Sequence, residues 1–426
     1  MNMSPKNIVN NVKVLTTKEY SVILLFSFVI LYFTFPPFNF LFSSISMFTP
    51  YVVGVLACIL AAPTFGRTRM FMMAFLYAVV LQLNAHYKAY VNWGNVLSES
   101  SSIIFTGFIV YYVLKLDVSQ RLSKTIISLF VIFLIINAIQ TYIFSRSIPG
   151  IMRWAAMSYN KEAAMPYFAL GLARYTFPHC LACIIPAFVL GLKIKGHSKR
   201  KRLFVLALLV LSLLLIYITE ATGALVVALF ALICAWVSKV GKLSNNLKKL
   251  ALVSFFLVPI ALSEDVQLGI INMAEEFVGD DSHYIPKLEE LKLSVTTDIE
   301  NDGDINYRGN LLSMTLESIA ESPIIGVSEK TFGNHNALPD RWAQYGLIGF
   351  LPIVLYIFWM VRFILGHIPI NIRTFYLIGV AANLMMMFSK SMFAWDQWFA
   401  FLVILPLMVL FCGKLEFRKK QLYSYE

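Results

Sequence analysis

The chain has 426 residues, of which 58% are hydrophobic and only 14% are charged. Because soluble domains carry about 25% charged residues, this composition excludes an ordinary soluble protein and predicts a membrane protein. The formal net charge of +11 does not indicate nucleic-acid binding, because Lys and Arg gather between apolar runs, where signals of membrane orientation lie.

Apolar runs long enough for a membrane helix, about 20 residues each, recur along the whole sequence. These runs are too long for the strands of a membrane barrel, so we expect an all-α polytopic bundle of about twelve transmembrane helices. The expected spans are 20–42, 47–63, 69–85, 101–115, 125–145, 174–195, 202–219, 221–238, 248–263, 341–365, 372–389 and 394–413.

The basic residues predict how this bundle is oriented. An even number of spans places both termini on one side, and the basic segments 193–202 and 239–249 fall on that same side. Positively charged loops tend to stay in the cytoplasm, so we expect both termini to be cytoplasmic. The expected parts are membrane helices within 1–263, a large outer loop at 264–340, and further membrane helices with a cytoplasmic tail within 341–426.

The two long outer loops differ in charge. Residues 264–340 contain sixteen of the 24 acidic residues of the chain and only four basic ones. The shorter loop, 146–173, carries Arg146, Arg153 and Lys161 instead, and Arg174 follows at its membrane boundary. Cations outside the membrane oppose the orientation signal, so an anionic ligand at the outer surface would explain them.

A helix is expected near the end of the acidic loop. Between Arg308 and Glu321, the residues Leu312, Leu316 and Ile319 recur at helical spacing among polar residues. An amphipathic helix of this kind lies on the membrane surface or against the bundle. The Pro and the Gly that follow it in the sequence are expected to end it.

Two arginines are candidates for binding an anion. Arg174 is expected at the outer end of a span, and Arg308 at the start of the surface helix. Arg contacts phosphate oxygens bidentately, and a helix N-terminus also favours anions. The alternatives are that Arg174 only reaches lipid headgroups and that Arg308 only pairs with the nearby Asp302 and Asp304.

A histidine is the third candidate for chemistry. His335 lies in a Gly-Asn-His-Asn turn directly before a long apolar span, and an imidazole is suited to general-base work near neutral pH. A lone loop histidine is more often simply exposed. That interpretation is given to His86, His197, His283 and His367.

Neighbouring residues extend the expected site. Asn336 follows His335, while Asp340 and Arg341 lie at the entry to the next span, where they either shape the same pocket or mark the membrane boundary. We assign substrate binding to Arg153, Asn336 and Arg341.

No metal and no cofactor is expected. The pair Cys180 and Cys183 has the CxxC spacing, but it lies within an apolar span. Zinc sites of this type need a second ligand pair, and none accompanies it in the sequence.

The stretch from Arg308 to Gly349 resembles the O-antigen ligase and polymerase superfamily. In this family an Arg, a surface helix, a Pro-x-x-Gly element and a His-Asn pair precede an aromatic- and Gly-containing membrane helix. Here these elements are Arg308, Pro323–Gly326, His335–Asn336 and Tyr345–Gly349. Upstream, RYTFPHCLA resembles the earlier Arg element of the family, with Arg174 in its place.

The sequence departs from the family pattern at two places. The hairpin tip at 219–223, where the family usually has a cation, contains Glu220 and no basic residue. A later acidic position of the family matches either Asp396 or Lys390. The roles of these three residues are therefore left open.

The resemblance implies a glycosyltransferase-C-like bundle that acts at the periplasmic face of the bacterial inner membrane. The donor would be an oligosaccharide linked to undecaprenyl pyrophosphate, held by Arg174 and Arg308, while His335 activates the acceptor hydroxyl. No nucleotide sugar is needed there, which agrees with the expectation of no cofactor. The expected partners are this lipid-linked oligosaccharide, the membrane and a chain-length regulator protein.

The expected function is that of an O-antigen polymerase, which moves the growing glycan onto a lipid-linked repeat unit. A ligase, which moves the finished glycan to the lipid A core, shares the donor and the same three residues. We favour the polymerase because the match is strongest at His335–Asn336 and weaker elsewhere, as in the more divergent branch. A lipid-linked glycan transporter is the alternative from another class, but the spans contain few charges and no paired broken helices.

Overall fold

The structure, a computed structural model, is helical over the residues that it describes, and no strand occurs among them. The expected all-α fold is therefore confirmed. The described residues are 17–42, 48–61, 64–117, 119–148, 151–152, 161–219, 221–241, 243–246, 248, 268–269, 271–273, 275–276, 285, 288–289, 292, 304–333, 336–390 and 395–413.

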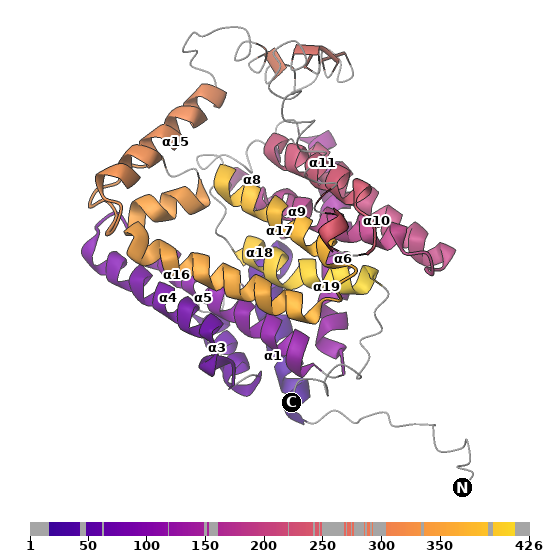
Figure 1. The fold of residues 1–426 in the computed structure, drawn as a ribbon, viewed down its shortest axis with the longest axis horizontal. Coiled ribbons are helices and arrows are strands. Elements are labelled where there is room, and N and C mark those ends of the chain that lie inside the picture. The colour runs from indigo at the N-terminus through magenta and orange to yellow at the C-terminus, as the bar shows by residue number, and fades with distance from the viewer. Residues whose placement is uncertain are drawn as a thin grey trace.

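The helices follow one another without large insertions between most of them (Figure 1). In chain order they are α1 (Thr17–Thr34), α2 (Pro36–Leu41), α3 (Thr49–Ala61), η2 (Phe65–Arg67), α4 (Arg69–Tyr87), α5 (Trp93–Tyr111), η3 (Tyr112–Leu116), α6 (Arg121–Ser147), α8 (Lys161–Ala169), α9 (Thr176–Lys193), α10 (Lys199–Ile218), α11 (Thr222–Val237), α15 (Asp304–Glu321), α16 (Ala337–His367), α17 (Arg373–Ser389), α18 (Trp395–Phe399), η4 (Ala400–Ile404) and α19 (Leu405–Cys412).

Within the described part of the chain, eight helical segments are long and apolar enough to cross a membrane. They are α1, α4, α5 with η3, α6, α9, α10, α16, and α18 through α19. Three shorter apolar helices, α3, α11 and α17, lie among them. The expected total of about twelve spans stays a prediction, because the span at 248–263 falls, apart from residue 248, outside the described residues.

Basic side chains close several helices at one end of the bundle. Lys193 donates to the carbonyl of Ser238 after α11 at 2.5 Å, and Lys201 donates to the carbonyl of Phe411 in α19 at 2.9 Å. Arg373 donates to the carbonyl of Ile368 after α16 at 2.8 Å. The last carbonyls of a helix have no partner in the helix itself, so a cation there satisfies them and favours the helix dipole.

The longest helix, α16, lies along α4 and has a kink (Figure 1). Gly346 has φ 60° and ψ −173°, a conformation that interrupts the helical hydrogen bonds. The segment from Pro323 to Val327 crosses α16 at this point. The amide of Leu347 donates to the carbonyl of Pro323 at 2.8 Å, and the amide of Val327 donates to the carbonyl of Ala343 at 2.9 Å. The crossing segment thus replaces bonds that the kink removes.

Helix α15 covers the stretch in which the sequence predicted a helix, and it lies against the start of α16 (Figure 1). Its contact face is largely polar: Thr315 is fully buried and Ser318 is 3% exposed. Ile319 packs against the small core of Val327, Phe332 and Ala343, whereas Leu312 and Leu316 are 39% and 55% exposed. The structure shows the contact with the bundle, and the expected placement on the membrane surface stays a prediction.

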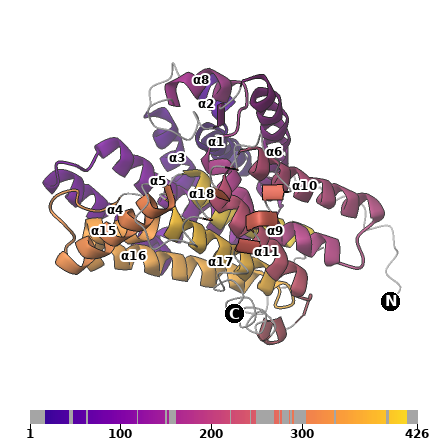
Figure 2. The ribbon, with the colours of Figure 1, turned by 90° about the horizontal axis from the view of Figure 1, so that it is seen from above.

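A smaller group of helices lies beside the main bundle. Helices α2 and α8 contact each other there, as the view from above shows (Figure 2). A separate small core forms around α8, made of Ile151, Met152, Ala164, Phe168 and Leu172. This core packs against the end of α6, and the chain then reaches Arg174.

Candidate functional site

The segment that joins α15 to α16, in which the sequence predicts a turn at 333–336, is the centre of the candidate site. The hydroxyl of Thr315 donates to the Asp340 carboxylate at 2.9 Å and accepts the amide N–H of Gly333 at 3.0 Å. The other carboxylate oxygen of Asp340 accepts the amide N–H of Asn336 at 2.6 Å. Thr315 and Asp340 are buried, and hydrogen bonds away from water are strengthened electrostatically. Both ends of the turn 333–336 are therefore fixed.

The sequence explains why α16 begins at this place. Asp340 lies in the first turn of α16, where a carboxylate is favoured by the helix dipole. It reaches back to the residue before the helix, as the acid of a capping box does. The amide of Ala337 donates to the carbonyl of Lys390 at 2.9 Å, so the end of α17 also contacts the start of α16.

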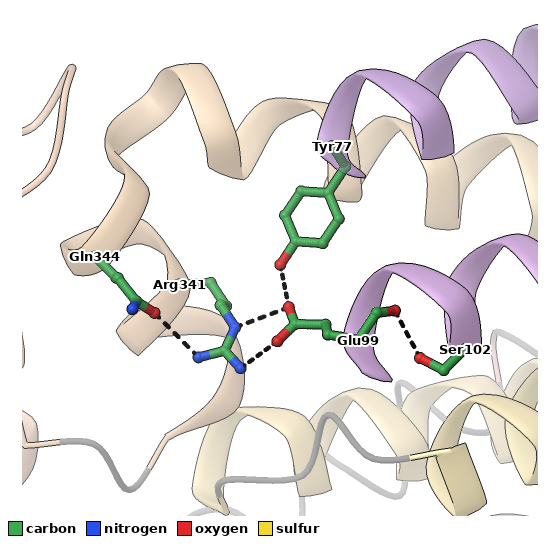
Figure 3. A network of polar contacts seen from close by, with 5 residues as sticks. All are labelled: Tyr77, Glu99, Ser102, Arg341 and Gln344. Atoms are coloured by element: carbon green, nitrogen blue, oxygen red, sulfur yellow. Dashed lines mark hydrogen bonds and ion pairs between the residues drawn. The ribbon is translucent and has the colours of Figure 1, made fainter. Parts of the chain in front are cut away.

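A buried ion pair lies next to this turn (Figure 3). The guanidinium of Arg341 donates to both carboxylate oxygens of Glu99 in α5, through Nε at 3.0 Å and Nη2 at 2.6 Å. The hydroxyl of Tyr77 in α4 donates to Glu99 as well, and Nη1 of Arg341 donates to the side chain of Gln344 at 3.3 Å. The side chains of Arg341 and Glu99 are 17% and 8% exposed. Three helices are thus joined by one charged cluster.

The loop between α4 and α5 contacts the segment that crosses α16. Lys88 donates to the carbonyl of Gln344 at 2.5 Å, and the hydroxyl of Tyr90 donates to the carbonyl of Val327 at 3.1 Å. Burial lowers the pKa of Lys88 and raises the pKa of Tyr90 to about 12. The Tyr90 phenol therefore keeps its proton, and remains a donor, throughout the neutral pH range.

A second polar group lies where α9 meets α18. The hydroxyl of Thr176 donates to one carboxylate oxygen of Asp396 at 2.7 Å. The other oxygen has no hydrogen-bond partner among the described residues, and Asp396 is 8% exposed. Arg174 is half-buried, donates weakly to the carbonyl of Phe33 at 3.5 Å, and interacts electrostatically with the Asp396 carboxylate.

A pocket lies beside Asp396, between α1, α6, α9 and the start of the last helical segment. Its walls are apolar apart from the Asp396 carboxylate, Thr34 and Cys180. The apolar lining residues are Ile30, Ile126, Leu129, Phe130, Phe133, Phe177, Ile184, Phe399, Ala400 and Ile404. Such a lining suits a hydrocarbon chain, with the polar end of the ligand toward Arg174 and Asp396.

The turn and the Asp396 group lie at the same end of the bundle. Lys390 contacts the start of α16, and Asp396 contacts the start of α9. The chain between Lys390 and Asp396 is six residues long, and an extended chain spans about 3.5 Å per residue, so their Cα atoms lie within about 21 Å of each other. Trp395 is buried between them and stacks on Phe33 with a ring separation of 4.3 Å.

The structure describes the sequence-predicted residues to different extents. Asn336 is 5% exposed, and its side-chain amide nitrogen has no partner among the described residues. Position 308 is helical and lies seven residues before Thr315 in α15, which is about 10 Å along a helix axis; nothing is described of its side chain. Arg153 and His335 lie outside the described residues, although Gly333 and Asn336 on either side of His335 do not.

Several polar residues of the site were missed by the sequence analysis: Thr315, and the two buried residues Glu99 and Tyr77. The sequence pattern placed the start of the fourth span at 101, which left Glu99 in a loop, and Tyr77 was taken as part of an ordinary apolar run. In the structure α5 begins at Trp93 and both residues are buried. The run Ser98 to Ser102, with Glu99 as its second residue, was the available signal, because a carboxylate inside a membrane helix needs a partner.

The structure also places Lys390, whose role was left open. It is 7% exposed, and its side chain lies beside Gly223 at the start of α11: a methyl group added to Gly223 would be 3.2 Å from the Lys390 Cε. A basic side chain thus approaches the hairpin tip 219–223, which has no cation of its own. Glu220 lies outside the described residues.

Comparisons with known proteins give no family for this chain. No protein-family profile matches the sequence, and no curated protein matches it either. The resemblance to the O-antigen ligase and polymerase superfamily therefore depends on the quoted residues alone.

Proposed function

We propose that this protein is an O-antigen (surface polysaccharide) polymerase, a lipid-linked glycosyltransferase of the bacterial inner membrane. It would transfer the growing glycan from undecaprenyl pyrophosphate to the non-reducing sugar of a lipid-linked repeat unit at the periplasmic face. The observation that carries this proposal is the buried Thr315–Asp340 pair, which fixes both ends of the turn that contains His335. General-base catalysis needs such a fixed geometry.

The proposed reaction has three parts. His335 takes the proton of the acceptor hydroxyl, and the oxygen then forms a bond to the anomeric carbon of the donor sugar. The bond from that carbon to the pyrophosphate breaks, and the pyrophosphate leaves with the bonding electrons. Arg308 and Arg174 stabilise its developing charge, which is the type of contact with the largest catalytic effect in many enzymes.

Other residues would bind the sugars and the lipid. The side-chain amide of Asn336 is buried without a described partner, so it is available to donate to a sugar hydroxyl or a phosphate oxygen. Arg153, in the basic outer loop, would add a contact to the anion. Arg341 is engaged with Glu99 and Gln344, which supports a role in holding the site rather than in contacting the substrate.

The proposed orientation follows from the two ends of the bundle. The end with Lys193, Lys201 and Arg373 carries the basic segments and would face the cytoplasm. The end with the turn 333–336 and Asp396 would then face the periplasm, together with the acidic loop 264–340. Both termini would be cytoplasmic.

Reconstitution of the full chain in liposomes tests the proposal. The vesicles contain the undecaprenyl-pyrophosphate-linked repeat unit and no nucleotide sugar. A ladder of longer lipid-linked glycans supports the polymerase. Glycan that appears only on added lipid A core shows a ligase instead, and the absence of both products overturns the glycosyltransferase assignment.

Single substitutions test the assigned residues in the same assay. We expect His335→Ala, Arg308→Ala and Arg174→Ala each to lower product formation by about 10²–10³-fold, the loss found when one electrostatic contact to a transition state is removed. His367→Ala and Arg362→Ala are matched controls, because both residues are exposed in the last turns of α16, at the opposite end of that helix from the turn. Near-normal turnover of His335→Ala contradicts its role as the base.

A further inference from the structure

Most N–H groups of the Arg341 guanidinium donate hydrogen bonds to Glu99 and Gln344. Nε and Nη2 of Arg341 both donate to Glu99, and Nη1 donates to Gln344 (Figure 3). Tyr77 donates to the same carboxylate from a third helix. A buried ion pair adds little net stability compared with apolar packing of the same shape, but it requires one geometry. We therefore expect the Glu99–Arg341 pair to act through the geometry that it imposes.

The pair acts on the helix turn that carries the candidate site. Asp340 and Arg341 are consecutive residues in the first turn of α16, and neighbouring residues on a helix point about 100° apart. Asp340 bonds to Thr315 of α15 and to the amide of Asn336, while Arg341 bonds to Glu99 of α5. These two directions together fix the rotation of α16 about its own axis at the turn 333–336.

The contact with Glu99 also ties the site to α5, a long and largely buried helix. Helix α5 packs against α4, α18 and η4, and Phe105 of α5 contacts the ring of Trp395. Trp395 immediately precedes Asp396 in α18. Glu99 therefore connects the turn 333–336 to α5, and α5 also contacts Trp395, the neighbour of Asp396.

We infer that Glu99 is a positioning residue for the proposed glycosyl transfer: through Arg341 it fixes the rotation of the first turn of α16 and, with it, the turn that contains His335. This inference rests on the proposed function for its effect on turnover. Its effect on the turn itself does not depend on that function. Glu99 touches neither the donor nor the acceptor in this scheme.

Kinetics of the reconstituted full chain test the inference first. Glu99→Gln keeps the size and the polarity of the side chain but removes its charge. We expect kcat to fall by about 10²-fold, the loss that a displacement of about 1 Å can cause, while KM for the lipid-linked repeat unit stays unchanged. A raised KM with an unchanged kcat would identify Arg341 as a substrate contact and overturn the inference.

A second variant separates geometry from charge. Arg341→Lys keeps the positive charge but cannot make the forked contact to Glu99. We expect a kcat below that of the parent protein, again with KM unchanged, whereas turnover equal to the parent contradicts a positioning role. Ser101→Ala is the matched control on α5, because Ser101 is buried and its hydroxyl donates only to the carbonyl of Ser98 in its own helix.

Hydrogen–deuterium exchange gives a readout that does not need activity. The amides of Gly333, Asn336 and Ala337 are each hydrogen-bonded in the structure. Their exchange should become faster in Glu99→Gln and Arg341→Lys but not in Ser101→Ala, because a loosened turn opens more often. Unchanged exchange in both variants overturns the inference even if the parent protein is an active polymerase. Faster exchange in a protein without transferase activity supports the effect of Glu99 on the turn and rejects the proposed function.

Discussion

Around Asp340, both carboxylate oxygens and the amides of the adjoining turn have hydrogen-bond partners. Around Asp396, one carboxylate oxygen has no partner among the described residues, and most of the neighbouring pocket is apolar. In the first region the Asp340 carboxylate and the adjoining amides are hydrogen-bonded, and the Asn336 side-chain nitrogen has no partner among the described residues. In the second region, the Asp396 oxygen without a described partner borders the pocket. The two regions at this end of the bundle therefore differ in how far the protein itself satisfies their carboxylates.

Removal of the charge of Arg341, which follows Asp340 in α16, should have the largest effect on stability. Arg341→Ala leaves the Glu99 carboxylate buried without its cation, and we expect the free energy of unfolding to fall by about 3–5 kcal/mol. Denaturant titration in mild detergent measures it. The double variant Glu99→Leu with Arg341→Met should be about as stable as the parent, since apolar replacement of a buried pair is often neutral. If Arg341→Ala is as stable as the parent, the Glu99–Arg341 pair does not stabilise this region.

A change of intermediate size is expected at the contact between α15 and α16. Thr315→Val keeps the shape of the side chain, but it leaves an Asp340 oxygen and the Gly333 amide without their hydroxyl partner. We expect a loss of about 1–3 kcal/mol in the free energy of unfolding. Ser313→Ala is the control on the same helix, because Ser313 is exposed and bonds only to Glu317. If the two variants lose the same stability, the Thr315 contact is not structural.

The smallest effect on stability is expected beside the pocket. Asp396→Asn keeps an oxygen that can accept from Thr176 and removes a charge that has only one described hydrogen bond. We expect the free energy of unfolding to change by less than about 1 kcal/mol, in contrast to Arg341→Ala. The same titration measures both variants. A loss as large as that of Arg341→Ala would show that the two regions are equally dependent on their charges.

The helices of the main bundle were predictable because each is a long apolar run. The span expected at 69–85 is α4, Arg69–Tyr87, and the span expected at 202–219 is α10, Lys199–Ile218. Lipid offers no hydrogen bonds to the backbone, so such a run has no alternative to a helix. The limits of α5 were harder to predict, because its first turns contain Gly, Asn, Ser and Glu and depend on partners in other helices.

The candidate site was predictable only as a set of positions. Periodicity predicted the helix α15, but it could not reveal that Thr315 and Ser318 would form the contact face, since this depends on Asp340 and Thr331 far along the chain. The sequence leaves open whether Asp340 shapes the pocket or marks the membrane boundary, and only the folded chain gives it a partner. Glu99 and Arg341 are 242 residues apart, a pairing that no local pattern contains.

The crossing of α16 by the segment 323–327 has a mechanical consequence. A methyl group on Gly346 would lie 2.2 Å from the Ile324 carbonyl, and one on Gly326 would lie 2.4 Å from the Gln344 carbonyl. The two backbones therefore interlock, each occupying the space that a side chain of the other would need. Straightening α16 would expel the segment, and pulling the segment away would leave broken helical bonds in an apolar setting. A displacement of α15 is therefore expected to move the first turns of α16 with it, because the crossing segment links the two helices.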